Sequence, residues 1–353
     1  MTNRQADKRL LRKTVLGDTG LTVSEVGFGG IPLTRVGQDE AVRLVRRALE
    51  LGFNFFDTAR MYGDSEAKLG AALEGRRDQV VLASKTIKRQ AGEAAAELAA
   101  SLENLRTGHL ELYQLHNLAQ PQDLEEVLAP GGAYQAAARA KAEGRVKQVG
   151  FSSHHPEVAI RAIETGKFAT VQFACNFVED EAAGRVFAAA RERGMGCIAM
   201  KPLGGGLLER ADLCFRWLQG QKGVVPIPGI QTQAEAEQIA ALYARRRPLN
   251  GGDRAEMARI RAGLGSRFCH RCGYCLPCPN GVEIPSVLLF SSQARRFPPQ
   301  QVARFAGRAM AGAGECTACG ECGQRCPYEL PIPEMIAENL AAWREFAARH
   351  GLA

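Results

Sequence analysis

Eight of the eleven cysteines lie in two short runs in the last quarter of the sequence, where their spacing is typical of iron–sulfur ligation. Each run begins with cysteines at every third position and ends with a cysteine followed by proline. The runs are Cys269-Cys272-Cys275-Cys278-Pro279 and Cys316-Cys319-Cys322-Cys326-Pro327. Three thiolates on a tight turn can point onto one cubane, while a fourth, more distant cysteine completes a neighbouring one. The two runs therefore predict two [4Fe-4S] clusters.

Disulfides and zinc fit this pattern less well. Disulfides need an oxidising compartment, and the basic stretch MTNRQADKRLLRKTV is not followed by the apolar segment of a secretory signal. Zinc sites usually draw on two separate Cys-x2-Cys pairs, whereas consecutive three-residue steps suit a cubane. We therefore expect iron and sulfur in this segment.

With these motifs the segment resembles the dicluster ferredoxin family. The resemblance implies crossed ligation, in which Cys278 completes the cluster of the second run and Cys326 completes that of the first. The first run departs from the usual family spacing, since only Leu276 and Pro277 precede its fourth cysteine, where three residues are usual.

The composition is that of a soluble protein. Of 353 residues, 46% are hydrophobic, yet no apolar run approaches the roughly 18 residues of a membrane span. The net charge of +7 is spread along the chain, and its one concentrated basic run, Arg245-Arg246-Arg247, reads as a solvated helix end. No aromatic-rich strands accompany that run. We expect a cytoplasmic protein without a nucleic-acid partner or a membrane span.

Residues 20–240 alternate short β-type runs with helix-length stretches. Eight segments have the pattern of strands: Glu25–Gly29, Phe53–Asp57, Val80–Ser84, Leu110–His116, Val146–Phe151, Ala169–Phe173, Gly196–Met200 and Gly223–Ile227. Eight β/α units in this length predict an α/β fold, a closed (β/α)8 TIM barrel. An open doubly wound sheet is the alternative, but Gly27, Gly29 and Gly30 do not form the G-x-G-x-x-G turn that would support it.

Four of the intervening stretches are amphipathic and long enough for helices: Glu40–Leu51, Glu93–Leu105, Leu124–Ala142 and Ala182–Arg193. We expect the barrel to occupy residues 13–242. Residues 243–264 read as a linker that contains a helix over Asp253–Arg261. Residues 265–350 are predicted to form a small, mainly helical, ferredoxin-like iron–sulfur domain.

Polar side chains close or follow the second, third and fourth predicted strands: Asp57, Tyr62, Lys85 and His116. In a (β/α)8 barrel the strand ends meet at one mouth, so these side chains are expected to converge there. Each alone has an ordinary explanation: a helix cap, loop packing, a surface charge and a core histidine. Together they indicate a site.

At this point the sequence resembles the aldo-keto reductase family, over about residues 13–240. The motifs that carry the resemblance are GDTGLTVSEVGFGG, NFFDTARMYGDSEAKLG, ELYQLHN, KQVGFSSH, VQFACNF and AMKPLGGG, in the family's order. It implies a catalytic tetrad of Asp57, Tyr62, Lys85 and His116, with NAD(P)H as hydride donor and a small carbonyl, or in reverse an alcohol, as substrate.

Each tetrad residue has a physical role in adding hydride to a carbonyl. Tyr62 would donate the proton that the oxygen needs. A free phenol has a pKa of about 10, and we expect the ammonium of Lys85, held by Asp57, to lower that pKa. A neutral His116 would orient the carbonyl oxygen by donating a hydrogen bond.

The resemblance also implies nicotinamide contacts. Ser152, Ser153 and Gln172 match the carboxamide-binding residues, although the second position is more often Asn; strand-end capping is their ordinary alternative. Met200 stands where many relatives stack an aromatic ring, and a thioether can still pack on a flat ring. The remaining expected cofactor contacts are Pro202, Leu203, Gly204, Gly206 and Gly229.

The sequence does not decide whether the cofactor carries a 2′-phosphate. Where NADPH-preferring relatives often carry a Lys-Ser pair and a later Arg, this sequence has Gly229, Ile230 and Glu235. A carboxylate would repel a phosphate. NADH and NADPH both remain candidates.

Three functions are compatible with a barrel joined to clusters. The first is a carbonyl reductase with structural or redox-sensing clusters. The second is a relay of single electrons between a barrel-bound nicotinamide or flavin and a redox partner protein, since a flavin normally splits a hydride. The third is a non-catalytic barrel, which the complete tetrad disfavours.

Overall fold

The computed structural model describes residues 11–264, 269, 275–326 and 329–352. The chain forms two compact units, which divide between Gly251 and Gly252.

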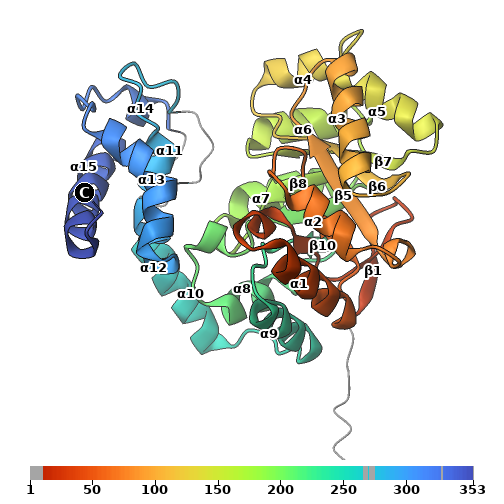
Figure 1. Ribbon diagram of the computed structural model, residues 1–353, viewed down its shortest axis with the longest axis horizontal. Helices are drawn as coiled ribbons and strands as arrows, with labels where there is room; N and C mark the ends of the chain where they lie inside the picture. The colour runs from red at the N-terminus through yellow and green to blue at the C-terminus, as the bar shows by residue number, and fades with distance from the viewer. Residues whose placement is uncertain (1–10, 265–268, 270–274, 327–328, 353) are drawn as a thin grey trace, which may run out of the picture. The chain divides into compact units, whose positions relative to one another are not determined.

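The first unit is a barrel of eight parallel strands, each paired with the next along the chain (Figure 1). The strands are β3 Phe28–Gly29, β4 Phe55–Asp57, β5 Val81–Thr86, β6 Leu110–Leu115, β7 Val146–Ser153, β8 Thr170–Ala174, β9 Gly196–Met200 and β10 Val224–Pro226. The end of β10 and the residues after it close the ring, because Gly27 N donates to Pro226 O and Gly29 N to Pro228 O, both at 2.8 Å. All eight predicted strands are present, and the predicted TIM barrel is confirmed.

Helices surround these strands. Those of the first unit are α1 Gln38–Glu50, α2 Ser65–Ala72, α3 Ala91–Asn104, α4 Pro121–Leu128, α5 Ala133–Ala142, α6 Pro156–Glu164, α7 Asp180–Arg191, α8 Ala211–Leu218 and α9 Gln233–Ala244, with short 3-10 helices η1 Ile31–Arg35, η2 Arg77–Gln79 and η3 Gly204–Gly206. Their inner faces are apolar at helical spacing; in α1, for example, Ala41, Leu44, Val45 and Ala48 are buried.

The single helix predicted over Leu124–Ala142 is wrong, since α4 and α5 are separate. Pro130 biases Ala129 away from helical angles, and Ala129 is extended at ψ 163°. Gly131 then has a φ of +81°, which favours glycine. At Gly132 a Cβ would lie 2.4 Å from Glu126 O and Val127 O, so only glycine fits the close turn.

A short antiparallel hairpin, which the sequence did not predict, precedes the barrel. It consists of β1 Lys13–Val15 and β2 Thr22–Ser24. Its turn bonds to residues near the starts of two barrel strands, because Asp18 N donates to Gly194 O (2.7 Å) and Gln148 Nε2 donates to Thr19 O (2.9 Å). Leu16 and Val23 are fully buried in the cluster inside the barrel. The hairpin therefore covers the N-terminal ends of the strands.

In its described residues, the second unit contains helices and no strands. The helices are α10 Gly251–Leu264, α11 Ile284–Leu288, α12 Phe290–Arg296, α13 Pro299–Ala313, α14 Glu321–Gln324 and α15 Ile332–His350. The predicted helix Asp253–Arg261 lies within α10. In Figure 1, α13 and α15 lie side by side. Phe290 of α12 packs edge-on against Trp343 of α15, with ring centroids 5.6 Å apart, in the hydrophobic core of the second unit.

No helix in the described parts of the chain is both long and apolar enough to cross a membrane.

Candidate functional site

A buried ion pair lies at the C-terminal ends of β4 and β5. Lys85 is fully buried, and its Nζ lies 2.5 Å from Asp57 Oδ1. It also donates to Thr58 O at 2.7 Å. The other carboxylate oxygen, Asp57 Oδ2, accepts a hydrogen bond from Gln114 Nε2 at 3.1 Å. Lys85 is therefore not a surface charge, and Asp57 is not a helix cap.

Tyr62 and His116 stand beside this pair. The Lys85 ammonium lies 5.1 Å from the centre of the Tyr62 ring. The rings of Tyr62 and His116 meet edge to face, with centroids 5.7 Å apart. Both residues are half-buried, unlike the ion pair beneath them. The four predicted residues thus converge at one end of the barrel.

The predicted direction of the Tyr62 pKa is wrong. Burial raises the pKa of the phenol above its ordinary value, and this effect outweighs the Lys85 ammonium, which lowers it. The Asp57 carboxylate raises the pKa further. Tyr62 therefore keeps its proton at neutral pH.

His116 is neutral, as expected. Burial lowers its pKa to about 3, and the nearby positive charges of Lys85 and Arg89 act in the same direction. Its Nδ1 is buried and makes no hydrogen bond among the described residues.

Three of the candidate nicotinamide residues lie on β7 and β8: Ser152 and Ser153 end β7, and Gln172 is in the middle of β8. Ser152 is the register partner of Gln172. The Ser152 hydroxyl accepts a hydrogen bond from Asn117 N at 2.8 Å. Gln172 is buried, and its Oε1 lacks a partner in the described part of the chain. Ser153 instead donates to Leu118 O at 2.6 Å, so its hydroxyl is engaged in local backbone capping.

The residues after β9 have an unusual backbone. Met200 ends the strand and packs against the cluster inside the barrel. Pro202 and Leu203 lead into η3, whose glycines all have positive φ: +56° at Gly204, +65° at Gly205 and +97° at Gly206. Side chains other than glycine's would strain this turn.

Gly229 has a packing role. It bridges to Gly29 across the barrel closure. A Cβ on Gly229 would lie 2.9 Å from Pro32 Cγ in η1. A side chain here would push the two segments apart.

Glu235 forms a capping box at the start of α9. Its Oε2 accepts hydrogen bonds from Gln231 N (2.7 Å) and Thr232 N (3.1 Å). In return, the Thr232 hydroxyl accepts one from Glu235 N. The S/T-x-x-E signature of this cap was present in the sequence but was not used in our prediction. Gln114, which orients Asp57, was also missed; a polar residue inside the apolar run Leu-Tyr-Gln-Leu-His was the available signal.

In the second unit, cysteines of both runs line one cavity. They are Cys278 from the first run and Cys316, Cys319 and Cys322 from the second. Two contacts hold the runs together there.

Those contacts join Asn280 to Thr317 (2.9 Å) and the Arg325 guanidinium to Pro277 O (3.1 Å). Cys269, Cys275 and Cys326 belong to or pack against the core of this unit. Cys272 lies outside the described residues. Where the structure describes the chain, no three Cys, His, Asp or Glu side chains are close enough to hold a single metal ion.

The other three cysteines, Cys175, Cys197 and Cys214, are buried in the barrel unit. Burial raises the pKa of the Cys197 and Cys214 thiols to about 12, so they are unreactive packing residues.

Two family models match the chain. The model of the aldo/keto reductase family matches residues 25–213. A 4Fe-4S dicluster domain model matches residues 268–331.

The similar proteins match mainly the barrel part of this chain. An uncharacterized oxidoreductase of Bacillus subtilis, YrpG, is 32% identical over an aligned region of 226 residues, and the match covers 55% of this chain and 67% of that protein. L-galactose dehydrogenase of Arabidopsis thaliana is 30% identical over 212 residues, covering 55% and 66%. A crystal structure of a Pseudomonas aeruginosa protein assigned to the aldo-keto reductases is 27% identical, with a TM-score of 0.61 over 68% of this chain and 98% of that one.

Proposed function

Because this chain belongs to the aldo/keto reductase family, we propose that it reduces a small carbonyl compound with NAD(P)H and that Tyr62 is the proton donor. The observation that carries the proposal is the buried Lys85–Asp57 pair directly beside a protonated Tyr62 and a neutral His116. The proposal is a specific case of an oxidoreductase that also carries a 4Fe-4S dicluster domain.

These residues can support the charge changes of carbonyl reduction. As the carbonyl carbon gains electrons, its oxygen becomes negative and takes the Tyr62 proton. Lys85 then faces a tyrosinate, whose charge its ammonium stabilises in a dry environment. Asp57 holds that ammonium in place, and neutral His116 donates a hydrogen bond to the same oxygen.

Nicotinamide fits the strand ends nearby. Bound as the reduced cofactor, it would supply the hydride. Gln172 Oε1 is a buried acceptor without a partner in the described part of the chain, and a carboxamide N–H could satisfy it. Ser152, its neighbour in register, would be the second contact. Ser153 would act indirectly, by holding Leu118.

We further propose that NADH is preferred over NADPH. The Glu235 carboxylate already accepts the N–H groups at the start of α9. A helix N-terminus is an anion site, and here an internal anion uses it, so a 2′-phosphate would meet repulsion rather than free donors.

For the cluster domain, we propose two [4Fe-4S] clusters with crossed ligation. Cys278 with Cys316, Cys319 and Cys322 would hold one cluster, and Cys269, Cys272, Cys275 and Cys326 the other. The support is the cavity that the first four share.

The replacement Tyr62→Phe tests the reductase. Against a panel of small aromatic and aliphatic aldehydes with NADH, kcat should fall by about 10²- to 10⁴-fold, the usual contribution of a general acid. The dissociation constant for NADH, followed by fluorescence, should stay within about twofold, because only a proton donor is lost.

The matched control is Tyr134→Phe. Tyr134 lies on α5 and donates to Lys167 O, away from the tetrad, so this variant should keep wild-type turnover. Unchanged turnover in Tyr62→Phe would rule out the proposed proton donor.

A further inference from the structure

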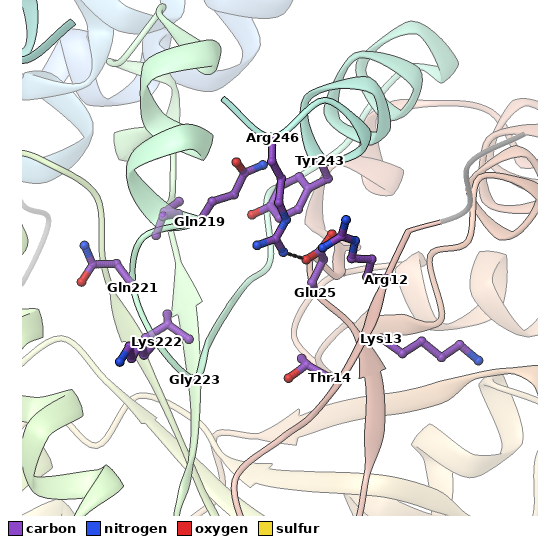
Figure 2. A pocket seen from close by; sticks show the side chains of 12 residues that line it. Arg12, Lys13, Thr14, Glu25, Gln219, Gln221, Lys222, Gly223, Tyr243 and Arg246 are labelled. Carbon is purple, nitrogen blue, oxygen red and sulfur yellow. Dashed lines mark hydrogen bonds and ion pairs between the residues drawn. The ribbon is translucent and has the colours of Figure 1, made fainter. Parts of the chain in front are cut away.

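A cavity of about 300 Å³ opens at the N-terminal end of the barrel strands, and the proposed reaction does not use it (Figure 2). It lies between β1, the connection from α8 to β10, and the residues that end α9. The tetrad lies at the C-terminal ends of the strands. The cavity is therefore a separate site.

Hydrogen bonds fix its walls. Arg216, which is 7% exposed, donates to Arg247 O and Pro248 O, both at 2.9 Å, and so ties the segment after α9 to α8. Gln219 lines the cavity and donates to Leu242 O at 3.1 Å. These hydrogen bonds fix the backbone around the cavity, while the basic side chains that line it are exposed.

The lining is strongly cationic. It holds four basic residues, Arg12, Lys13, Lys222 and Arg246, and one acidic residue, Glu25, which pairs with Arg246. In Figure 2, Arg12 lies beside Glu25 while Lys13 extends away from the cavity. No described residue forms an ion pair with Arg12 or Lys222. The C-terminal ends of α8 and α9 contribute only about half a negative charge each, so the positive charge is in excess.

Two buried polar atoms at the cavity have no partner in the described part of the chain. One is Oη of Tyr243, a residue that is 3% exposed. The other is Oε1 of Glu25, whose side chain is 10% exposed. An unsatisfied buried polar atom costs about 1–3 kcal/mol. Burial raises the pKa of Tyr243, so its hydroxyl stays a neutral donor.

We propose that this cavity binds a small organic phosphate that carries hydroxyl groups, the chemistry of a sugar phosphate. Arg12 and Lys222 supply charge for the phosphoryl group, and Tyr243 donates a hydrogen bond. Glu25 Oε1 accepts a hydrogen bond from a ligand hydroxyl, a contact that bare phosphate at neutral pH makes poorly. The volume is at the lower end of ligand sites, about 300–1,000 Å³, so the site is too small for a second dinucleotide.

Calorimetry on the full-length protein tests this, with ribose 5-phosphate, ribose and inorganic phosphate as probes. Ribose 5-phosphate should bind in a 1:1 ratio, inorganic phosphate more weakly, and ribose not measurably. Arg12→Gln and Lys222→Gln should each weaken ribose 5-phosphate binding about tenfold, the loss expected for a charged hydrogen bond. Lys167→Gln is the matched control, because Lys167 precedes β8 at the same end of the barrel and is not part of the cavity lining; its affinity should equal that of wild type.

Tyr243→Phe provides an independent test. It removes a buried hydroxyl that has no partner among the described residues, so the variant should unfold at the same or a higher temperature while binding ribose 5-phosphate several-fold more weakly. All titrations are repeated with saturating NADH.

Binding that NADH abolishes and that Arg12→Gln and Lys222→Gln leave unchanged would place the ligand at the catalytic mouth and overturn the proposal. Equal affinities for inorganic phosphate and ribose 5-phosphate would overturn the proposal that the ligand carries hydroxyl groups.

Discussion

At the scale of single residues, the arrangement around Lys85 explains why a charge is stable deep in the barrel. Asp57 Oδ1 and Thr58 O accept hydrogen bonds from its ammonium, and Gln114 satisfies the other carboxylate oxygen. Breaking such a pair by removing one partner is costly, because it leaves an uncompensated buried charge. The same burial keeps Tyr62 protonated. Tyr62 can therefore donate a proton, as the proposed reaction requires.

His116 makes a measurable residue-scale prediction. With a folded pKa of about 3, its ring should stay neutral from neutral pH down to about pH 4. An ordinary histidine titrates near 6.5. Two-dimensional NMR of histidine-labelled protein, with His116→Gln to assign the signal, should show this resonance unchanged between pH 7.5 and 4.5.

The sign for stability follows from the same shift. Below 6.5 the unfolded chain gains a proton at this position while the folded chain does not, so this residue's contribution lowers stability as the pH falls from 6.5 towards 3. A His116 signal that titrates near 6.5 would contradict the assigned environment.

At the scale of elements, the parallel strands bring the site together. Because Asp57, Lys85 and His116 end or follow three successive strands, neighbouring pairing places them at one mouth. The start of α9 bears on the proposed cofactor preference. Its N-terminal donors are occupied by its own Glu235.

Replacing Glu235 with Gln tests this element. Gln also completes a capping box, so the fold is kept while the charge is removed. The dissociation constant for NADPH should fall several-fold, and that for NADH should stay constant, because the repulsion acts only on the 2′-phosphate.

Glu235→Ala is the control for capping. It should lose about 0.5–2 kcal/mol of stability, as cap removal does. Because it also lacks the carboxylate, it should bind NADPH as tightly as Glu235→Gln does, or more weakly only by the factor that this loss of stability explains. No gain in NADPH affinity in either variant would show that Glu235 does not set the preference.

At the scale of the whole molecule, one chain joins an aldo/keto reductase barrel to a 4Fe-4S dicluster domain. A cubane accepts one electron, whereas a hydride carries two, and a flavin usually mediates between them. Without such a mediator we expect the clusters not to take electrons from NADH.

Anaerobic EPR of reconstituted protein checks this. Iron and sulfide should be present in the amounts that two [4Fe-4S] clusters require. NADH should leave the clusters oxidised and without signal, and dithionite should produce the signal of reduced [4Fe-4S]. Cys278→Ala should lose one cluster, while Cys214→Ala, a buried barrel cysteine, should keep both. A signal on adding NADH alone would favour the electron relay instead.

Local patterns in the sequence were sufficient for much of this molecule. Strand and helix periodicity predicted the eight strands, and hence the barrel, because burial on a regular element imposes a regular spacing. The cysteine runs predicted the dicluster domain that the family comparison supports, since ligands on one turn are close in sequence. The four residues of the candidate site could be named because each lies at the end of a strand or follows one.

Tertiary structure decided what depends on distant segments. Desolvation by the assembled barrel reversed the expected shift of the Tyr62 pKa. A three-residue hairpin strand is too short to show a period, and its position became visible only against the strands it covers. The cationic cavity joins residues near 12, 25, 220 and 245, which no local pattern relates. Such features depend on burial and on contacts between segments far apart in sequence, and these exist only once the chain has folded.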